Sequence, residues 1–147
     1  MISIEELQSL VGAEFPEGTF TIEPYEHWLS ADAVMSPALP DGVAHPMYAY
    51  YAAIRGMGKS LEEVFADAGS SAADGPMFGE AGLDFHGSLV VGATYTVRGR
   101  YTSAVRKEGR RAGVFDIVGF ELEVVADDGA IVAVSTNSFV YPRREDS

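Results

Sequence analysis

An uninterrupted apolar segment, Pro46-Met-Tyr-Ala-Tyr-Tyr-Ala-Ala-Ile54, lies in the first half of this chain of 147 residues. Proline suits the first turn of a helix, where its missing N–H is not needed, and no breaker follows before Gly56-Met57-Gly58. Almost every side chain from Met47 to Ile54 is apolar or aromatic, and such a helix needs cover on all sides. We therefore expect a central helix that other elements wrap.

The second half of the chain predicts the sheet that covers this helix. Residues 94–106 alternate strictly, with Tyr95, Val97 and Tyr101 on one face and threonine and arginine side chains on the other. Residues 114–125 return with apolar side chains at every second position, and Asp127-Asp128-Gly129 is a hairpin signal before a last strand from Ile131 to Tyr141. Three long antiparallel strands in sequence predict a meander with one covered face.

Shorter elements precede the meander. Ser3 and Glu6 have the spacing of a capping box and predict a short first helix, and Ser60 with Glu63 predicts another that ends at Gly69. Residues 18–23 alternate as a strand that Pro24 closes, and residues 31–42 are expected to form a loop. The expected fold class is α+β, in one domain over residues 1–147.

Composition excludes several classes of protein. With 47% hydrophobic and 22% charged residues the chain can bury one core, and with no cysteine it holds no disulfide and no thiolate metal site. No apolar run approaches the length of a membrane span, and the N-terminus is acidic where a secretory signal would be basic. We expect a soluble, cytoplasmic protein that binds no metal.

The formal net charge of −12 argues against nucleic acid as a partner. The basic residues are concentrated, because six of the ten lie between Arg98 and Arg111. Such an island could bind phosphate groups through several guanidinium forks, or it could be a solvated hairpin whose charge protects a sheet edge.

The order of elements resembles the hot-dog fold, in which a sheet wraps a helix. Glycine-containing motifs add detail: Val11-Gly-Ala-Glu-Phe-Pro16, Asp41-Gly-Val-Ala-His-Pro-Met47, the segment from Gly79 to Gly92, and Asp128-Gly-Ala-Ile-Val-Ala133. Together, from Leu10 to Arg143, they resemble the MaoC-like dehydratases, and most closely the N-terminal MaoC dehydratase domain.

This resemblance implies reversible addition of water to an enoyl thioester carried on coenzyme A or an acyl carrier protein. It implies no cofactor beyond that carrier, and a dimer whose sheets join edge to edge, either a homodimer or a heterodimer with another MaoC-like chain. The chemistry needs a base for water, an acid for the α-carbon and N–H donors for the thioester oxygen.

The motif that carries this chemistry in the family is missing. Active members have Asp-x-Asn-Pro-x-His before the main helix, whereas residues 28–40 here contain Asp32 and no histidine. The nearest substitutes are Asp41 and His45, with His27 as a replacement base. Each has a structural alternative: Asp41 in a turn, His45 as a local helix-entry residue, and His27 in an aromatic lid. Pro46 stands where relatives have a glycine whose N–H holds the thioester oxygen.

The candidate substrate-binding residues are spread along the chain. Tyr48 and Tyr51 could position an acyl group through their hydroxyls, although core positions are the alternative. His86 stands before a strand that ends the substrate tunnel in relatives, although a structural role is the alternative, and Arg106 and Arg110 belong to the basic island.

The sequence and the family resemblance leave three hypotheses for the function. The first is a MaoC-like hydratase or dehydratase with an altered dyad. The second is a non-catalytic hot-dog subunit that forms the acyl tunnel with a catalytic partner chain. The third is a hot-dog acyl thioesterase, which would need a carboxylate on or near the main helix, where Glu62 and Glu63 lie beyond its end.

Overall fold

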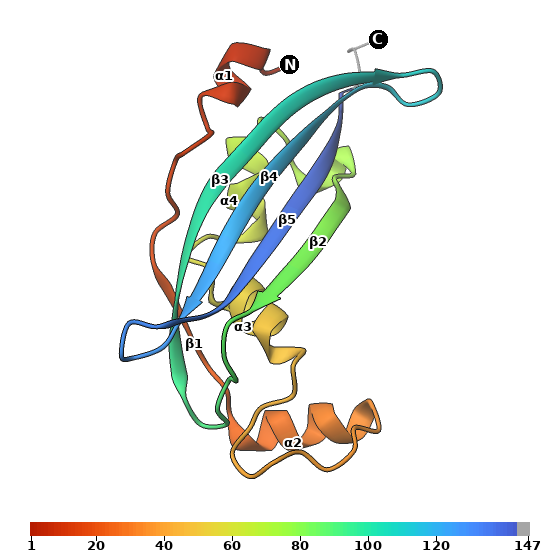
Figure 1. Ribbon diagram of the computed structural model, residues 1–147. Helices are drawn as coiled ribbons and strands as arrows, with labels where there is room; N and C mark the ends of the chain where they lie inside the picture. The colour runs from red at the N-terminus through yellow and green to blue at the C-terminus, as the bar shows by residue number, and fades with distance from the viewer. Residues whose placement is uncertain (144–147) are drawn as a thin grey trace.

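The computed structural model describes residues 1–143, so the last four residues of the domain expected over 1–147 lie outside it. The elements in chain order are α1 (Ile4–Gln8), β1 (Gly18–Thr21), α2 (Pro24–Ala33), α3 (Tyr48–Gly56), α4 (Leu61–Asp67), the 3₁₀ turn η1 (Ala72–Asp74), β2 (Met77–Phe85), β3 (Thr94–Gly109), β4 (Gly113–Val125) and β5 (Ile131–Arg143). The five strands form one antiparallel sheet in the order β1-β3-β4-β5-β2 (Figure 1). The expected α+β class and the meander are confirmed.

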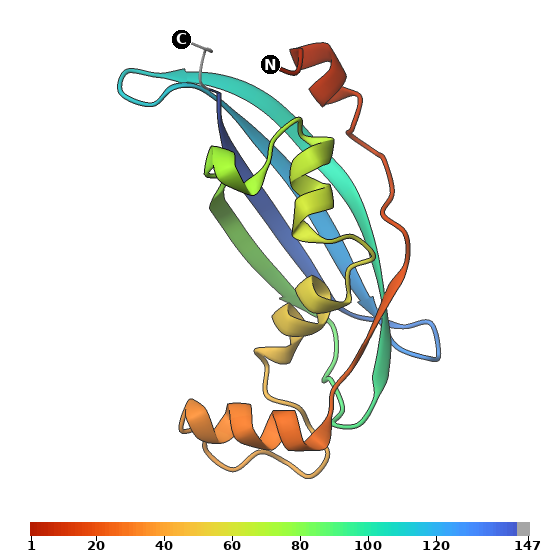
Figure 2. The same cartoon turned by 180° about the vertical axis from the view of Figure 1, so that it is seen from behind.

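Helix α3 lies against one face of the curved sheet, with α4 beside it (Figure 2). Its buried side is made of small residues, Ala49, Ala52, Ala53 and Gly56, which allow the helix to approach the strands closely. A Cβ at Gly56 would stand 2.7 Å from Val97 Cγ2, so no larger residue fits. The expected burial on all sides is wrong for the single chain, because Tyr51 stays 37% exposed.

Both predicted capping boxes are present. The Ser3 N–H donates to Glu6 Oε2 at 2.9 Å, and the Ser60 N–H donates to Glu63 Oε2 at 2.7 Å. Each pair satisfies N–H groups that a helix start leaves without an intrahelical partner.

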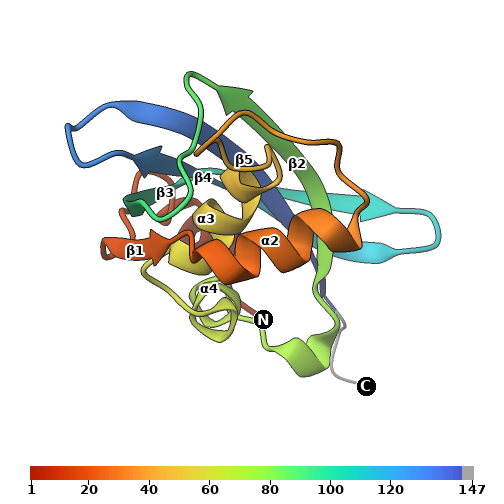
Figure 3. The ribbon, with the colours of Figure 1, turned by 90° about the horizontal axis from the view of Figure 1, so that it is seen from below.

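Helix α2 was not expected, and the prediction of a loop over residues 31–42 is wrong for its first three residues. Pro24, interpreted as the end of a strand, is the first residue of α2, since a proline ring presets the helical φ and costs no hydrogen bond there. No side chain of α2 is buried, so its sequence has no core-facing stripe to detect. Figure 3 shows α2 crossing the end of the molecule.

A β-bulge in β3 breaks the strict alternation that was expected over residues 94–106. The register of β3 shifts between Tyr101 and Ser103, so the alternation predicted to be strict reverses beyond this point. Arg106, expected on the same face as Arg98 and Arg100, instead pairs across the strands with Asp116, which is fully buried.

Asp116 is the centre of a buried ionic cluster. Its Oδ1 accepts from Arg106 Nε at 2.7 Å, and its Oδ2 accepts from Arg143 Nε at 2.6 Å. The remaining guanidinium donors bind the carbonyls of Ile2, Ala68 and Gly69. Burial alone would raise the pKa of the Asp116 carboxyl, but the hydrogen bonds from the two arginines hold this pKa below its usual range. The cluster joins three strands to the end of α4 and to the start of the chain.

Replacement of Asp116 by asparagine should therefore destabilise the fold strongly. Asp116→Asn leaves two guanidinium groups without their counter-charge, and we expect a loss of about 3–5 kcal/mol in the free energy of unfolding, measured in urea. The matched control is Glu121→Gln, which breaks the exposed pair with Arg100 and should cost about 0–1 kcal/mol.

The pH dependence has a fixed sign. The pKa of Asp116 is lower in the folded chain than in the unfolded chain. The ionised carboxylate therefore adds to the free energy of unfolding at pH values above the ordinary aspartate pKa of about 3.9, and this stabilisation is lost as pH falls through the lower folded pKa. If Asp116→Asn and Glu121→Gln lowered the free energy of unfolding by the same amount, the role of Asp116 as the centre of a stabilising ionic cluster would be contradicted.

Candidate functional site

The N-terminal end of α3 is the place where the family resemblance puts the thioester oxygen. Pro46 has no N–H, and the Met47 N–H donates to the ring nitrogen Nδ1 of His45 at 3.1 Å. The Tyr48 N–H donates to the His45 carbonyl at 2.9 Å, and the Ala49 N–H to the Pro46 carbonyl at 3.1 Å. The first turn of α3 therefore has no N–H group left for a substrate oxygen.

The backbone N–H of His45, just before this turn, is also engaged. It donates to Nε2 of His27, which reaches it from α2, at 2.8 Å. The His27 ring lies 5.3 Å from the Tyr48 ring, centroid to centroid. Burial lowers the pKa of His27, and the charge that His45 can carry lowers it further. His27 is thus neutral near pH 7, as an acceptor of an N–H bond must be.

The two hydrogen bonds assign the neutral tautomers of both histidines. In His27 Nε2 accepts, so the proton is on Nδ1, and in His45 Nδ1 accepts, so the proton is on Nε2. The free nitrogen of each ring is therefore an N–H donor. Neither imidazole has a free lone pair with which to take a proton from water.

Asp41 does not form a dyad with His45. It occupies an exposed turn in which the Val43 N–H donates to the Pro40 carbonyl at 3.1 Å and Gly42 adopts a φ of +77°. No hydrogen bond joins the Asp41 carboxylate to either histidine in the described part of the chain. The structure does bring Asp41 and His27 to one cleft of about 610 Å³, together with Trp28 and Asp32.

The two tyrosines differ in accessibility. Tyr48 is 1% exposed, and its hydroxyl donates to Ser30 Oγ of α2 at 3.2 Å. Tyr51 packs edge-on against the Tyr48 ring, with centroids 5.5 Å apart, and is partly exposed. Of the two, only Tyr51 has a hydroxyl that makes no hydrogen bond to the described residues.

A second, mainly apolar pocket of about 370 Å³ adjoins the cleft. Its walls include Ala44 and Pro46 at the start of α3 and Phe85 at the end of β2. Leu39 and Val43 line both cavities, so the two lie next to each other. Sequence patterns could not reveal these cavities, because their walls come from three separate segments: α2, residues 36–46 and residues 85–91.

The other three candidate residues lie elsewhere. The side chain of His86 is exposed, and its backbone N–H pairs with the Val132 carbonyl at 2.9 Å. Arg106 is held by Asp116, and Arg110 is exposed in the turn between β3 and β4. Since β3 has 16 residues, it spans about 50 Å, and this turn lies at the opposite end of the sheet from the start of α3 (Figure 1).

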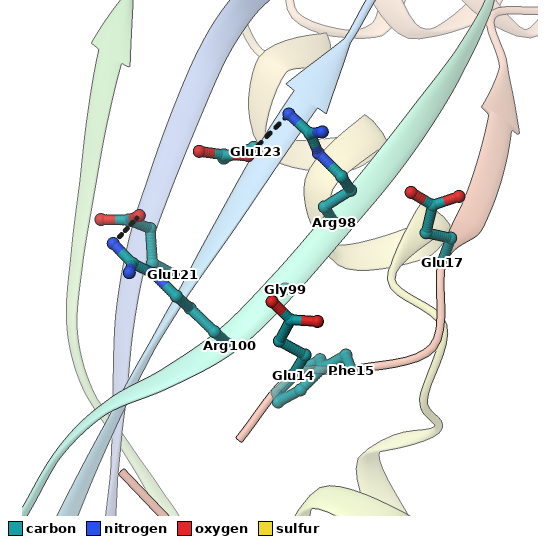
Figure 4. Close-up of a pocket in the computed structure, with 8 residues that line it drawn as sticks. All are labelled: Glu14, Phe15, Glu17, Arg98, Gly99, Arg100, Glu121 and Glu123. Atoms are coloured by element: carbon teal, nitrogen blue, oxygen red, sulfur yellow. Dashed lines mark hydrogen bonds and ion pairs between the residues drawn. The ribbon is translucent and has the colours of Figure 1, made fainter. Parts of the chain in front are cut away.

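Three of the six residues of the basic island, Arg106 among them, are paired with carboxylates. Arg98 pairs with Glu123 at 3.1 Å and Arg100 with Glu121 at 3.2 Å, across β3 and β4 (Figure 4). The hollow that these pairs line, of about 380 Å³, also includes Glu14 and Glu17, so it holds more carboxylates than guanidinium groups. Such a surface repels phosphate.

Two further features of the described residues 1–143 bear on function. No group of three or more histidine, aspartate or glutamate side chains is arranged to hold a metal ion. No helix there has the length and apolarity needed to span a bilayer.

Comparison with known proteins identifies the fold. No family model matches the chain, and no curated protein matches it by sequence. Solved structures do match. The ChsH1-ChsH2 complex from Mycobacterium tuberculosis is similar with a TM-score of 0.70 at 12% identity, covering 98% of this chain and 91% of that chain. A monoamine oxidase regulatory protein from Archaeoglobus fulgius gives 0.69 at 15% identity, covering 98% and 96%.

The truncated HadBC 3R-hydroxyacyl-ACP dehydratase complex, also from Mycobacterium tuberculosis, gives a TM-score of 0.63 at 17% identity, covering 89% of this chain and 96% of that chain. This chain has the hot-dog fold. The expectation from the order of its elements is confirmed. At these identities the likeness shows the fold alone.

The tautomers can be measured directly. In long-range ¹⁵N–¹H spectra at about pH 7.5, His27 should be protonated on Nδ1 and His45 on Nε2, because the opposite nitrogens accept backbone N–H bonds. His86, whose exposed side chain makes no hydrogen bond to the described residues, should show no such fixed tautomer. A His45 ring protonated on Nδ1 would leave Nε2 free as a base and would contradict the assignment.

Proposed function

We propose that this chain is the non-catalytic subunit of a hetero-oligomeric acyl-thioester hydratase or dehydratase, in which a second hot-dog chain carries the reacting groups. The observation that carries the proposal is the state of the two histidines. Hydration needs a base to take a proton from water and N–H donors for the thioester oxygen. At the start of α3 both ring acceptors are occupied, and so are the backbone N–H groups.

In this proposal the chain contributes binding surface. The pocket of about 370 Å³ between the start of α3 and the end of β2 offers apolar walls for an acyl group, which include Leu39, Pro46 and Phe85. The partner chain supplies the base that activates water and the acid that protonates the α-carbon. The acyl group is carried on coenzyme A or phosphopantetheine, and the proposal needs no other cofactor.

The free edge of the sheet supports a partner chain. Among the described residues 1–143, strand β2 pairs only with β5, so one side of its nine residues is open there. Met77, Phe78 and Phe85 of this strand are about half exposed. An open apolar edge of this length favours pairing with another strand. The strand at the other edge, β1, has only four residues.

The charge of this edge favours a different chain over a second copy. Strand β2 carries Glu80 and Asp84 and no basic residue, and the whole chain has a net charge of −12. Two copies would bring like charges together, whereas a partner edge with lysine or arginine would complement them. The HadBC and ChsH1-ChsH2 neighbours are themselves complexes.

A second candidate is a hydratase active on its own through Asp41, His45 and His27. The shared cleft of His27 and Asp41 favours it, but His27 would first have to release the His45 N–H. The thioesterase reading is weaker. Helix α3 has no carboxylate, and Glu63 closes the capping box of α4.

Hydration of crotonyl-CoA separates the first two candidates. The purified chain alone should show no turnover above buffer. Co-expressed with a companion MaoC-like chain that carries Asp-x-Asn-Pro-x-His, it should form a complex at least about 100-fold more active than this chain alone, because the companion supplies the base and the acid. Turnover by the lone chain would contradict the proposal.

A substitution at the open edge of β2 tests whether this edge binds the partner chain. Phe85→Asp places a charge at the end of β2 and should abolish the complex, measured by size-exclusion chromatography, and with it the rate of hydration. Val105→Asp is the matched control, since Val105 is similarly exposed on β3, and it should leave both unchanged. A complex that tolerates Phe85→Asp would exclude this edge.

A further inference from the structure

Helix α2 stands out from the rest of the fold. None of its side chains is buried, and Tyr25, Trp28 and Leu29 are each more than half exposed. In Figures 2 and 3 it lies across the end of the molecule, beyond the start of α3. A helix with so little buried apolar area gains little stability from packing, so its few polar contacts determine its position.

Two of these contacts reach the start of α3. Nε2 of His27 accepts the His45 N–H at 2.8 Å, and Ser30 Oγ accepts the Tyr48 hydroxyl at 3.2 Å. The bond to His27 is the shorter and lies in a partly buried place, so its loss leaves a donor without a partner.

The third contact is an ion pair between Glu26 and Arg55, 3.6 Å apart. Both side chains are substantially exposed, so the pair contributes little. In the described part of the chain these three are the side-chain polar contacts that join α2 to other elements.

The bond to His27 depends on protonation. A neutral imidazole accepts an N–H bond at its bare nitrogen, but an imidazolium has N–H groups at both positions. Protonation of His27 would therefore place two donors, Nε2–H and the His45 N–H, head to head. The bond would be lost, and the positive ring would be pushed from its site toward water.

We propose that His27 is a pH-sensitive latch that holds α2 against the start of α3 when neutral and releases it when protonated. Release also frees the His45 N–H and opens the cleft that His27 lines. The device belongs to the chain itself and does not depend on the proposed function.

The surroundings of His27 set the pH at which the latch opens. The charged and titratable side chains around it are Glu23, Glu26 and Asp32 of α2, Asp41 of the following segment, and His45, Tyr48 and Arg55 on the side of α3. Burial lowers the pKa of His27 first, and the charge of His45 lowers it further.

The sign of the effect follows. The pKa of His27 is lower in the folded chain than in the unfolded chain. The hydrogen bond of the latch therefore stabilises the docked position of α2 fully at pH values above the ordinary histidine pKa of about 6.5. Its contribution is lost as pH falls through the lower folded value.

Hydrogen exchange of α2 tests the latch. In the wild-type chain, protection of residues 24–33, corrected for the intrinsic pH dependence of exchange, should fall about tenfold between about pH 7.5 and about pH 5. Far-UV circular dichroism checks that the sheet stays folded. The single tryptophan, Trp28, lies on α2, and its fluorescence should change over the same pH range.

Three variants identify the titrating group. His27→Gln keeps an acceptor for the His45 N–H at every pH and should remove the transition in protection. His45→Asn keeps an acceptor for the Met47 N–H and should move the midpoint to higher pH, because a neighbouring charge is gone. His86→Gln should change nothing. A transition that persists in His27→Gln, or unchanging protection in the wild type, would overturn the proposal.

Discussion

The close approach of α3 to the sheet is the constraint on which the other features depend. A helix lined by Ala49, Ala52, Ala53 and Gly56 can lie against the strands at a distance that no larger side chain allows. The curved sheet then covers one side of the helix, and aromatic rings such as Phe120 and Phe139 pack against each other in the same core. Because α3 is fixed in this way, the position of its first turn is fixed as well, and with it the chemistry that the turn can offer.

That first turn determines the functional interpretation. Pro46 removes the N–H group that the family resemblance implies for the thioester oxygen, and His45 and His27 occupy the neighbouring donors. An arrangement in which two imidazoles accept backbone hydrogen bonds stabilises the start of a helix. It is poorly suited to taking protons from water, and this is the basis on which we propose a binding subunit rather than a complete enzyme.

Sequence patterns predicted the elements that have local signatures. The capping boxes at Ser3 and Ser60 and the meander followed from spacing alone, and all are present. Helix α2 was missed because a proline that ends a strand and one that begins a helix look the same in sequence. The exchange of the two faces of β3 after Tyr101 was missed because a β-bulge has no local signature in the sequence. The contact of His27 with His45 joins positions 18 residues apart and depends on the placement of α2, so only the structure could reveal it.

The most direct test of the central claim is the rate of the assembled complex when this chain carries His45→Asn. Asparagine can still accept the Met47 N–H, so the start of α3 keeps its hydrogen bond, but the His45 imidazole that could transfer a proton is gone. If His45 is a structural cap in a non-catalytic subunit, kcat for crotonyl-CoA hydration should stay within about twofold of the wild-type complex. A fall of about 100-fold or more, with the complex intact, would show that His45 is a catalytic base or acid and would contradict the account.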